Sequence, residues 1–410
     1  MHIRYLSLTN FRNYARLELA LPRSALLLHG ANAQGKTNIL EAIYLLSSGT
    51  SPLTSSDREM IKWETEKDGL TYARVWAEVV RSQQVQEIEV ILEKKPLTNG
   101  SERLQKTLRV DRVRKRRSEF TGRLNVVLFM PQDMDLIAGP PAQRRHYLDE
   151  TLCQVDGVYA DALDSYGEAL RQRNAALRYI REQSGDITQL VPFEEVIAYN
   201  GARIVEGRYA LLNALSEIAD RIHRQLTGAS DWLRLDYQPS LAPVSPAGSD
   251  AQLILGPTLT HGPHGEKDLK AQEDSFQRAL EACRSEDIAR GTTSIGPHRD
   301  ELRIVSGNPV QGTHEVDLGT YGSRGQQRTA VLALKLAELE WLRIKTGDTP
   351  VLLLDEVLAE LDASRRHDLI SRVSSVEQAV LTATDLDMFS QTFRDQARLC
   401  EVQAGIVRTG

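Results

Sequence analysis

The sequence of 410 residues has few cysteines, no signal-peptide pattern and no long hydrophobic run. Its three cysteines, Cys153, Cys283 and Cys400, lie far apart without a CxxC pair, which argues against a disulfide framework and a four-ligand zinc site. The best apolar runs, 25–28 and 351–354, are much shorter than the roughly 18 residues that cross a membrane. The first residues lack a basic region followed by a long apolar stretch. We therefore expect a soluble, cytoplasmic protein that does not associate with membranes.

Positive charge is also in deficit, because 50 Lys and Arg face 56 Asp and Glu, for a formal net charge of −6. This balance excludes a uniformly basic nucleic-acid-binding surface, so a polyanion must bind at a local patch. Residues 103–123, the basic segment, hold nine basic and two acidic side chains, a net charge of +7, so the rest of the chain carries −13. We predict that this segment contacts the phosphate backbone of duplex DNA, although a solvated hairpin protecting an edge strand is the alternative. The residues named for this contact are Arg112, Arg114, Lys115, Arg116 and Arg117.

The pattern of apolar residues divides the chain into three segments. Residues 1–138 and 291–410 alternate strand-like and helical stretches, whereas 139–290 are mainly helical. The simplest account is one α/β domain assembled from both chain ends, with an α-helical arm inserted between them. The clearest loop is 239–265, which contains five prolines and four glycines. The predicted helices are 38–46, 160–182, 193–225, 272–290 and 329–344, and the predicted strands are 16–21, 25–28, 72–80, 87–92, 125–129, 302–305 and 351–354.

Residues 30–37 read Gly-Ala-Asn-Ala-Gln-Gly-Lys-Thr and fit the phosphate-binding pattern G-x-x-x-x-G-K-[ST]. They follow an apolar run and open a predicted helix, which is the strand–loop–helix setting that this motif requires. Glycines let backbone N–H groups surround a β-phosphate, and the helix N-terminus adds positive potential. Lys36 would reach the β- and γ-phosphates as a catalytic cation, and Thr37 would bind Mg²⁺. The predicted ATP-binding residues of this stretch are Gly30, Ala31, Asn32, Ala33, Gln34, Gly35, Lys36, Thr37 and Asn38.

Two acidic residues, Asp355 and Glu356, follow the apolar run 351–354. An all-apolar strand suits the centre of a parallel sheet, and ligands bind at the carboxyl ends of such strands. We predict that Asp355 holds Mg²⁺ and that Glu356 orients or deprotonates the attacking water. By itself the pattern also fits a buried strand that ends in a solvated acidic turn, but the phosphate loop in the same chain favours the functional interpretation.

The segment Ser323-Arg324-Gly325-Gln326 precedes the predicted helix 329–344. Ser323 with Gln326 three residues later fits a capping box. The segment also resembles the S-G-G-Q-like signature of ABC-type ATPases, which lies about one helix and one strand before the Mg²⁺-binding aspartate. That resemblance implies that Ser323, Gly325 and Gln326 bind the γ-phosphate of a nucleotide held by the opposite subunit. A hydroxyl, a glycine N–H and a helix N-terminus together suit an anion.

Further segments along the whole chain resemble the RecF family, in the SMC-like branch of the ABC-type ATPases. These segments are 8–14, 35–43, 129–133, 139–149, 296–300, 325–329 and 354–362. The resemblance implies an ABC-type ATPase head with a helical arm, which binds ATP and Mg²⁺, forms an ATP-dependent homodimer and binds double-stranded DNA and single-strand/double-strand junctions. It further implies slow, DNA-stimulated hydrolysis of ATP to ADP and phosphate. The function would be recombinational repair, replication-fork maintenance and the DNA-damage (SOS) response, in which the protein helps to load recombinase at gaps together with RecR and RecO.

The same resemblance assigns roles to three further residues. Gln132 would be the Q-loop residue that senses Mg²⁺ and the γ-phosphate and takes part in catalysis. Asp362 would be the D-loop residue that acts across the dimer, and Arg12 would touch the nucleotide from the first strand. The sequence departs from many ABC-type ATPases at Ala33 and, relative to transporters, at Arg324, where each has glycine. The segment 381–385 also lacks the switch histidine of transporters, in agreement with slow turnover.

The main alternative is the ATPase subunit of an ABC membrane transporter, which shares Lys36, Ser323 and Asp355. The basic segment and the missing switch histidine argue against it. A P-loop small-molecule kinase would leave the signature unexplained. The pair Arg144-Arg145 could meet phosphate, a partner protein or solvent, and 296–300 fits either a turn or, by the resemblance, a coupling element between arm and ATPase.

Overall fold

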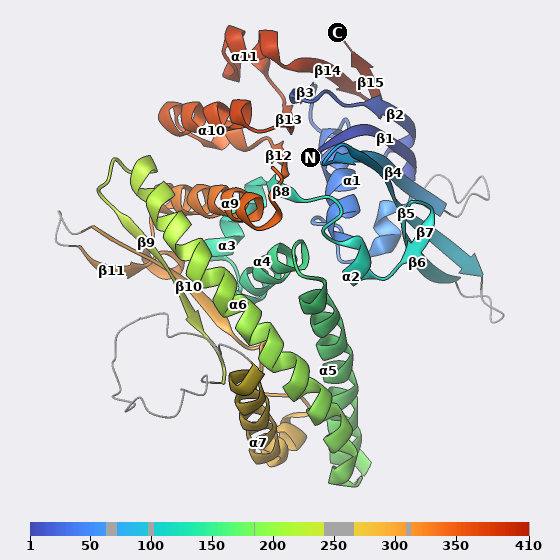
Figure 1. Ribbon diagram of the computed structural model, residues 1–410, viewed down its shortest axis with the longest axis vertical. Coiled ribbons are helices and arrows are strands. Elements are labelled where there is room, and N and C mark those ends of the chain that lie inside the picture. Colours follow the sequence, from blue (N-terminus) through green and yellow to red (C-terminus); the bar gives the residue numbers. More distant parts are fainter. Residues whose placement is uncertain (63–71, 97–101, 184, 242–265, 309–312, 410) are drawn as a thin grey trace. The chain divides into compact units, whose positions relative to one another are not determined.

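The computed structural model describes all residues except 63–71, 97–101, 184, 242–265, 309–312 and 410 (Figure 1). The chain forms two compact units, which we call the head unit (Met1–Asp133 with Glu338–Gly410) and the arm unit (Met134–Ala337). Most of the predicted loop 239–265 lies outside the described residues. The predicted divisions at 138/139 and 290/291 stay predictions. No described helix is long and apolar enough to span a membrane.

The head unit contains a six-stranded sheet of order β15-β14-β3-β13-β12-β8. Neighbouring strands run parallel except for the β14–β15 pair, which is antiparallel. Every residue of β12 and β13 is buried, as expected for central strands that are covered on both faces. Strands from both chain ends interleave in this sheet, as the sequence predicts. Their bounds are β3 Ala25–His29, β8 Val126–Phe129, β12 Val351–Asp355, β13 Ala379–Ala383, β14 Arg398–Gln403 and β15 Ile406–Thr409.

A second, antiparallel sheet of the head unit has the order β2-β1-β4-β5-β6-β7. One of its faces is buried, because alternate residues of β4, including Val75 and Val79, are inaccessible to solvent. Helix α1 (Lys36–Ser48) packs against both sheets, and Ile39 and Ile43 join the shared hydrophobic core. The strand bounds are β1 His2–Phe11, β2 Tyr14–Ala20, β4 Tyr72–Arg81, β5 Gln84–Pro96, β6 Glu102–Val110 and β7 Val113–Lys115.

The other helices of the head unit are short, apart from α10. Helices α10 and α11 lie on the side of the parallel sheet away from α1 (Figure 1). Together with α1 they cover both faces of the sheet, which explains its continuous apolar strands. The bounds are η1 Asp57–Met60, α2 Arg117–Phe120, η5 Val357–Glu360, α10 Ala363–Ser375, η6 Leu386–Met388 and α11 Gln391–Gln396, with η3 Pro131–Met134 at the unit boundary.

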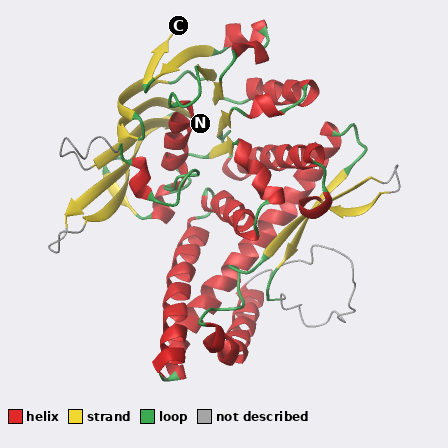
Figure 2. Cartoon of the chain, turned by 180° about the vertical axis from the view of Figure 1, so that it is seen from behind, coloured by secondary structure: helices red, strands yellow, loops and turns green. Residues whose placement is uncertain are grey.

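The arm unit is mainly helical (Figure 2), with α5 and α6 packed along each other. It also contains a three-stranded antiparallel sheet of order β11-β10-β9, and β9 adds a strand to the segment 139–290 that is predicted to be mainly helical. Strand β9 alternates buried Leu233, Leu235 and Tyr237 with more exposed residues, a period-2 pattern that the sequence analysis missed. The bounds are α3 Asp135–Ala138, α4 Pro141–Cys153, α5 Gly157–Gln183, η4 Ile187–Leu190, α6 Val191–Leu226, β9 Trp232–Gln238, α7 Glu266–Arg290, β10 Glu301–Asn308, β11 Thr313–Asp317, α8 Leu318–Tyr321 and α9 Arg324–Thr346, which continues into the head unit.

Buried ion pairs join the elements of the arm unit. Arg208, fully buried in α6, pairs with Asp149 of α4 at 2.9 Å and with Asp300 at 3.5 Å. The Asp300 carbonyl accepts a hydrogen bond from Arg145 at 2.8 Å, and His298 contacts the Tyr166 hydroxyl at 2.6 Å. Removing one partner of such a pair would leave an uncompensated buried charge. Arg145 and the segment 296–300 therefore have a structural role in the arm unit.

Candidate nucleotide-binding site

The loops that follow five parallel strands emerge at one edge of the head's parallel sheet. The register places His29 of β3 beside Ala383 of β13, and Asp355 of β12 beside Thr382. Strand β8 ends beside β12, with Phe129 paired to Leu354. This carboxyl edge is where open α/β sheets bind ligands. It brings together the phosphate loop, the acidic pair, the segment 130–133 and the turn after β14.

The phosphate loop, residues 30–37, requires glycine at two positions. Gly30 and Gly35 have φ values of 143° and 113°, which L side chains rarely adopt. A Cβ on Gly30 would lie 2.4 Å from the Val402 carbonyl oxygen, and one on Gly35 would lie 2.5 Å from Asn13 Nδ2. Ala33 has φ 63°, a left-handed conformation that alanine can adopt at a modest cost. The departure at Ala33 therefore leaves the loop in a strained but accessible conformation.

Lys36 lies inside this loop with only 4% of its surface exposed. Its Nζ donates hydrogen bonds to the carbonyl oxygens of Gly30, at 2.8 Å, and Ala31, at 2.9 Å. The ammonium also pairs with Glu356 Oε1 at 3.1 Å. The loop carbonyls thus fix a buried cation beside an acidic residue that follows β12, more than 300 residues later in the chain.

Thr37 and Asp355 form the second contact across this edge. The Thr37 hydroxyl lies 2.9 and 3.0 Å from the two carboxylate oxygens of Asp355, and the Thr382 hydroxyl donates to Oδ1 at 2.7 Å. Burial raises the pKa of Asp355, and the hydrogen bonds from Thr382 and Thr37 partly offset this rise. A hydroxyl and a carboxylate are the hard oxygen ligands that suit Mg²⁺, which keeps several waters or phosphates of its own. No cluster of three or more His, Cys, Asp or Glu that could hold a metal ion occurs among the described residues. The roles of Thr37 and Asp355 as Mg²⁺ ligands stay predictions.

Glu356 occupies a strained position next to Asp355. Its φ is 53°, and its N–H donates to the Thr382 hydroxyl at 3.0 Å. About a third of its side chain (34%) is exposed, unlike that of Lys36. Strained residues of this kind gather at functional sites, where the surrounding contacts hold them in place. The contact between Thr382 and the acidic pair is not predicted by the sequence, because 381–385 lacks the histidine that marks this position in transporters.

Arg12 and Gln132 are predicted to contact the nucleotide or Mg²⁺ from outside the phosphate loop. Arg12 forms a bidentate pair with buried Glu41, at 2.8 and 2.5 Å, and donates to the Glu59 carbonyl at 2.9 Å. The Arg12 guanidinium is thus largely committed to Glu41, and its contact with nucleotide stays a prediction. Gln132 is exposed in η3, directly after β8. Asn38 donates to Asn13 Oδ1 at 2.8 Å, so its side chain supports the loop from behind.

The signature residues belong to the arm unit and are exposed. The Ser323 N–H donates to Gln326 Oε1 at 2.9 Å, and the Gln326 N–H lies 3.3 Å from Ser323 Oγ. This reciprocal arrangement is a capping box at the start of α9. Asp362 in the head unit caps α10 in a similar way, since it accepts the Arg365 N–H at 3.0 Å, which lowers the pKa of Asp362. The nucleotide contacts of these residues stay predictions.

The basic segment forms β6, β7 and α2, and most of its predicted DNA contacts have acidic neighbours. Arg112 pairs with Glu87 at 3.1 Å, and Lys115 and Arg116 lie 3.5 and 3.6 Å from Glu119. The Arg117 side chain donates to the Ser48 carbonyl at 3.4 Å. Arg114 differs, because it is exposed and forms no ion pair with the part of the chain that the structure describes. It lies directly across from Arg109 in the β6–β7 ladder.

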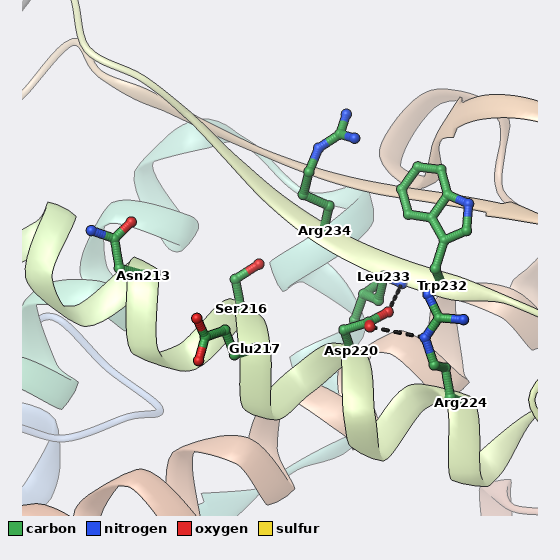
Figure 3. Close-up of a pocket in the computed structure, with 8 residues that line it drawn as sticks. All are labelled: Asn213, Ser216, Glu217, Asp220, Arg224, Trp232, Leu233 and Arg234. Carbon is green, nitrogen blue, oxygen red and sulfur yellow. Dashed lines mark hydrogen bonds and ion pairs between the residues drawn. The ribbon is translucent and has the colours of Figure 1, made fainter. Parts of the chain in front are cut away.

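A pocket of about 540 Å³ lies in the arm unit between α6 and β9 (Figure 3). Its lining includes Asp220, Arg224, Trp232 and Arg234. Asp220 accepts the Leu233 N–H at 2.9 Å and Arg224 Nε at 2.9 Å, so this carboxylate is satisfied within the wall.

The sequence is similar to those of known proteins along almost its whole length. Residues 2–408 match the family model for the RecF/RecN/SMC N terminal domain. The DNA replication and repair protein RecF of Roseiflexus castenholzii is 39% identical over 417 residues, with 99% of each chain covered. The protein of the same name from Staphylococcus carnosus is 34% identical, again with 99% of each chain covered. This chain belongs to the RecF family.

Solved structures support the fold of this RecF-family chain. The structure of the recombination mediator protein RecF-ATPrS in the RecFOR pathway matches with a TM-score of 0.81 at 28% identity, covering 100% of this chain and 98% of that one. The corresponding RecF-ATP structure has a TM-score of 0.79. The predicted fold class is confirmed: an ABC-type ATPase head is built from both chain ends, with a helical arm inserted.

Proposed function

We propose that this chain is an ATP-dependent DNA-binding protein of recombinational repair and replication-fork maintenance. The observation that carries the proposal is the convergence of four residues at the carboxyl edge of the parallel sheet. Lys36 lies 3.1 Å from Glu356, and Thr37 lies 2.9 Å from Asp355. These are the groups that phosphoryl-transfer sites use to bind a nucleotide and activate water. RecF relatives solved with ATP and with ATPrS support ATP as the nucleotide.

In this proposal the phosphate loop holds the β-phosphate and Lys36 neutralises charge on the β- and γ-phosphates. The Thr37 hydroxyl and Asp355, with Gln132 from the end of β8, would hold Mg²⁺, which supplies charge stabilisation at the phosphates. Glu356 orients or deprotonates the attacking water, because its partly exposed carboxylate lies beside Lys36. Hydrolysis is slow and serves as a switch.

ATP would join two copies of the chain. The exposed Ser323, Gly325 and Gln326 at the N-terminus of α9 offer a hydroxyl and N–H groups to the γ-phosphate bound by a second copy, while Asp362 acts across the same interface. A nucleotide that contacts both subunits favours the dimer, and loss of its γ-phosphate removes that preference. The dimer is thereby coupled to the state of the nucleotide.

Double-stranded DNA, including junctions with single strands, is the proposed polyanion. Arg114 of the basic segment supports this proposal, because it is exposed, has no ion-pair partner among the described residues, and phosphate-backbone binding requires such local positive charge. Its neighbour Arg109 is paired with Glu89 at 3.1 Å. The RecFOR pathway named for the solved relatives supports RecR, with RecO, as partners in recombinase loading at gaps.

Sedimentation and phosphate-release measurements, each with and without ATP and duplex DNA, test the proposal. We expect a monomer without nucleotide, a dimer with ATP and Mg²⁺, and faster hydrolysis when duplex DNA is added. A protein that stays monomeric with ATP and whose hydrolysis ignores DNA contradicts the proposal. ATP-dependent dimers without any response to DNA would instead favour the ATPase subunit of a transporter.

A further inference from the structure

One residue of the phosphate loop, Gln34, is anchored by two β-turns from opposite ends of the chain. Its main-chain oxygen accepts hydrogen bonds from Asn13 Nδ2, at 2.9 Å, and from the Gly405 N–H, at 3.1 Å. Its side-chain oxygen accepts the Ala404 N–H at 2.7 Å, and its side-chain nitrogen donates to the Asn32 carbonyl at 3.2 Å. Four hydrogen bonds therefore meet at one residue of a loop whose positions 31–33 are exposed.

The two turns also contact each other. Each is a two-residue hairpin connection, with Phe11 paired to Tyr14 in one and Gln403 to Ile406 in the other. In the second turn, Ala404 and Gly405 have φ values of 49° and 75°, the left-handed pair that a tight hairpin needs. A Cβ on Gly405 would lie 2.9 Å from the Asn13 carbonyl oxygen, so the close approach of the turns requires glycine.

Anchoring the carbonyl of Gln34 has a direct consequence for the next N–H group. In a planar trans peptide the C=O and N–H bonds point in opposite directions. The Gln34 carbonyl points toward the turns, so the Gly35 N–H points away from them. The following peptide is fixed in the same way, because the buried Tyr14 hydroxyl donates to the Gly35 carbonyl at 3.0 Å. Burial raises the pKa of Tyr14, which keeps this hydroxyl protonated as a donor.

We infer that Gln34 is a positioning residue and that the turns at 12–13 and 404–405 preorganise the N–H groups of Gly35 and Lys36 for a nucleoside polyphosphate. The C-terminal hairpin β14–β15 thereby sets the affinity of the loop for its ligand. Donors that are already oriented lose less conformational freedom on binding, which is why preorganisation increases affinity. This inference rests on the proposed function, in which the loop binds ATP.

Two variants test it, each removing one side of the anchor. Gln34→Ala deletes the side-chain bonds to Ala404 and Asn32, and Asn13→Ala deletes a donor to the Gln34 carbonyl. Each should raise the dissociation constant for both ATP and ADP by about 3- to 10-fold, since both nucleotides carry a β-phosphate. The KM for ATP should rise in parallel while kcat stays within about twofold, the pattern of lost uniform binding.

Gln403→Ala is the matched control. It removes an exposed glutamine from the same hairpin, one residue before the turn, and should leave the nucleotide affinities unchanged. Equal melting temperatures for the three variants would show that the losses are not caused by unfolding. The inference is overturned if Gln34→Ala and Asn13→Ala bind ATP and ADP as tightly as the parent chain, or if their kcat falls while KM is unchanged.

Hydrogen exchange without nucleotide separates this inference from the proposed function. Peptides covering residues 30–37 should exchange faster in Gln34→Ala than in Gln403→Ala if the turns order the loop. Equal exchange overturns the positioning role whether or not the chain binds ATP. A parent chain that binds no ATP in the same assay refutes the proposed function, and the exchange result then decides the positioning role independently.

Discussion

The chain presents two segments with a glycine and a helix N-terminus, and they are built in opposite ways. At the phosphate loop, Gly35 precedes α1 and no side chain caps the helix. At the signature, Ser323 and Gln326 satisfy each other's N–H groups at the start of α9. The first four N–H groups of a helix need partners. The phosphate loop leaves these donors for a ligand, whereas at the signature one of them, the Gln326 N–H, already has Ser323 Oγ as its acceptor.

Their support differs as well. The phosphate loop is held from outside by Asn13, Tyr14 and the turn at 404–405, with Lys36 buried at its centre. The signature residues are exposed, and a Cβ on Gly325 would approach no atom closer than 4.0 Å. The phosphate loop is therefore preorganised for its ligand, whereas the signature residues remain accessible to a second molecule. This contrast predicts different responses to mutation.

The largest expected effect is at the buried cation of the phosphate loop. Lys36→Arg places a larger guanidinium between the Gly30 and Ala31 carbonyls, where the ammonium now donates two hydrogen bonds. Hydrolysis should fall by about 100-fold or more, as when a preorganised electrostatic group is lost, while some ATP binding remains. Steady-state phosphate release measures the effect. Lys345→Arg, an exposed lysine of α9, is the control, and unchanged turnover in Lys36→Arg would contradict the role of this residue.

At the signature, the capping role and the proposed phosphate role can be separated with one substitution. Aspartate caps helices as well as serine does, but its charge would repel a γ-phosphate. Ser323→Asp should therefore keep the melting temperature of the parent chain and weaken ATP-dependent dimerisation by about 10-fold or more. Sedimentation with ATP measures the dimer. If the aspartate variant dimerises normally, the segment acts only as a helix cap and does not bind the γ-phosphate held by a second copy.

The basic segment allows a smaller test of the same comparison, between an arginine that has an ion-pair partner and an arginine that has none among the described residues. Arg112 pairs with Glu87, whereas Arg114 has no ion-pair partner among the described residues. Arg114→Glu should weaken duplex binding by about 3- to 10-fold and reduce the salt dependence by about one phosphate contact. Arg112→Glu changes the net charge equally, so it controls for long-range electrostatics and should have the smaller effect. If titrations over a range of salt show equal losses of duplex affinity in the two variants, Arg114 contributes no more to DNA binding than Arg112 does.

The sequence predicts the residues of the phosphate loop and the acidic pair because each motif is contiguous and follows an apolar strand. Their meeting at one edge follows from the parallel order of β3, β12 and β13, which an α/β pattern already implies. The supports of Gln34 could not be predicted in this way. Asn13 and Gly405 contact it from 21 and 371 positions away along the chain, through two turns whose mutual approach depends on strand order and not on local spacing.

The smallest expected effect concerns stability, and it should have opposite signs at Asp355, beside the phosphate loop, and at the signature residue Ser323. Burial raises the pKa of Asp355, so its ionised form is less favourable in the folded head unit than in the unfolded chain. This carboxylate weakens the fold at pH values above its raised pKa, and the weakening fades as the pH falls through that value. Asp355→Asn should therefore raise the melting temperature at neutral pH by about 2–4 °C. Ser323→Ala should lower it by a similar amount, since it removes a helix cap.

Thermal melts between pH 4 and pH 8 would check both signs. The gain from Asp355→Asn should shrink toward acidic pH, because protonation removes the same charge in the parent chain. The loss from Ser323→Ala should show no such trend, since the cap does not titrate. A lower melting temperature for Asp355→Asn at neutral pH would mean that its bonds to Thr37 and Thr382 outweigh the cost of burying the carboxylate. The hydrogen bonds of Asp355 would then stabilise the fold without a ligand, as the helix cap at Ser323 does.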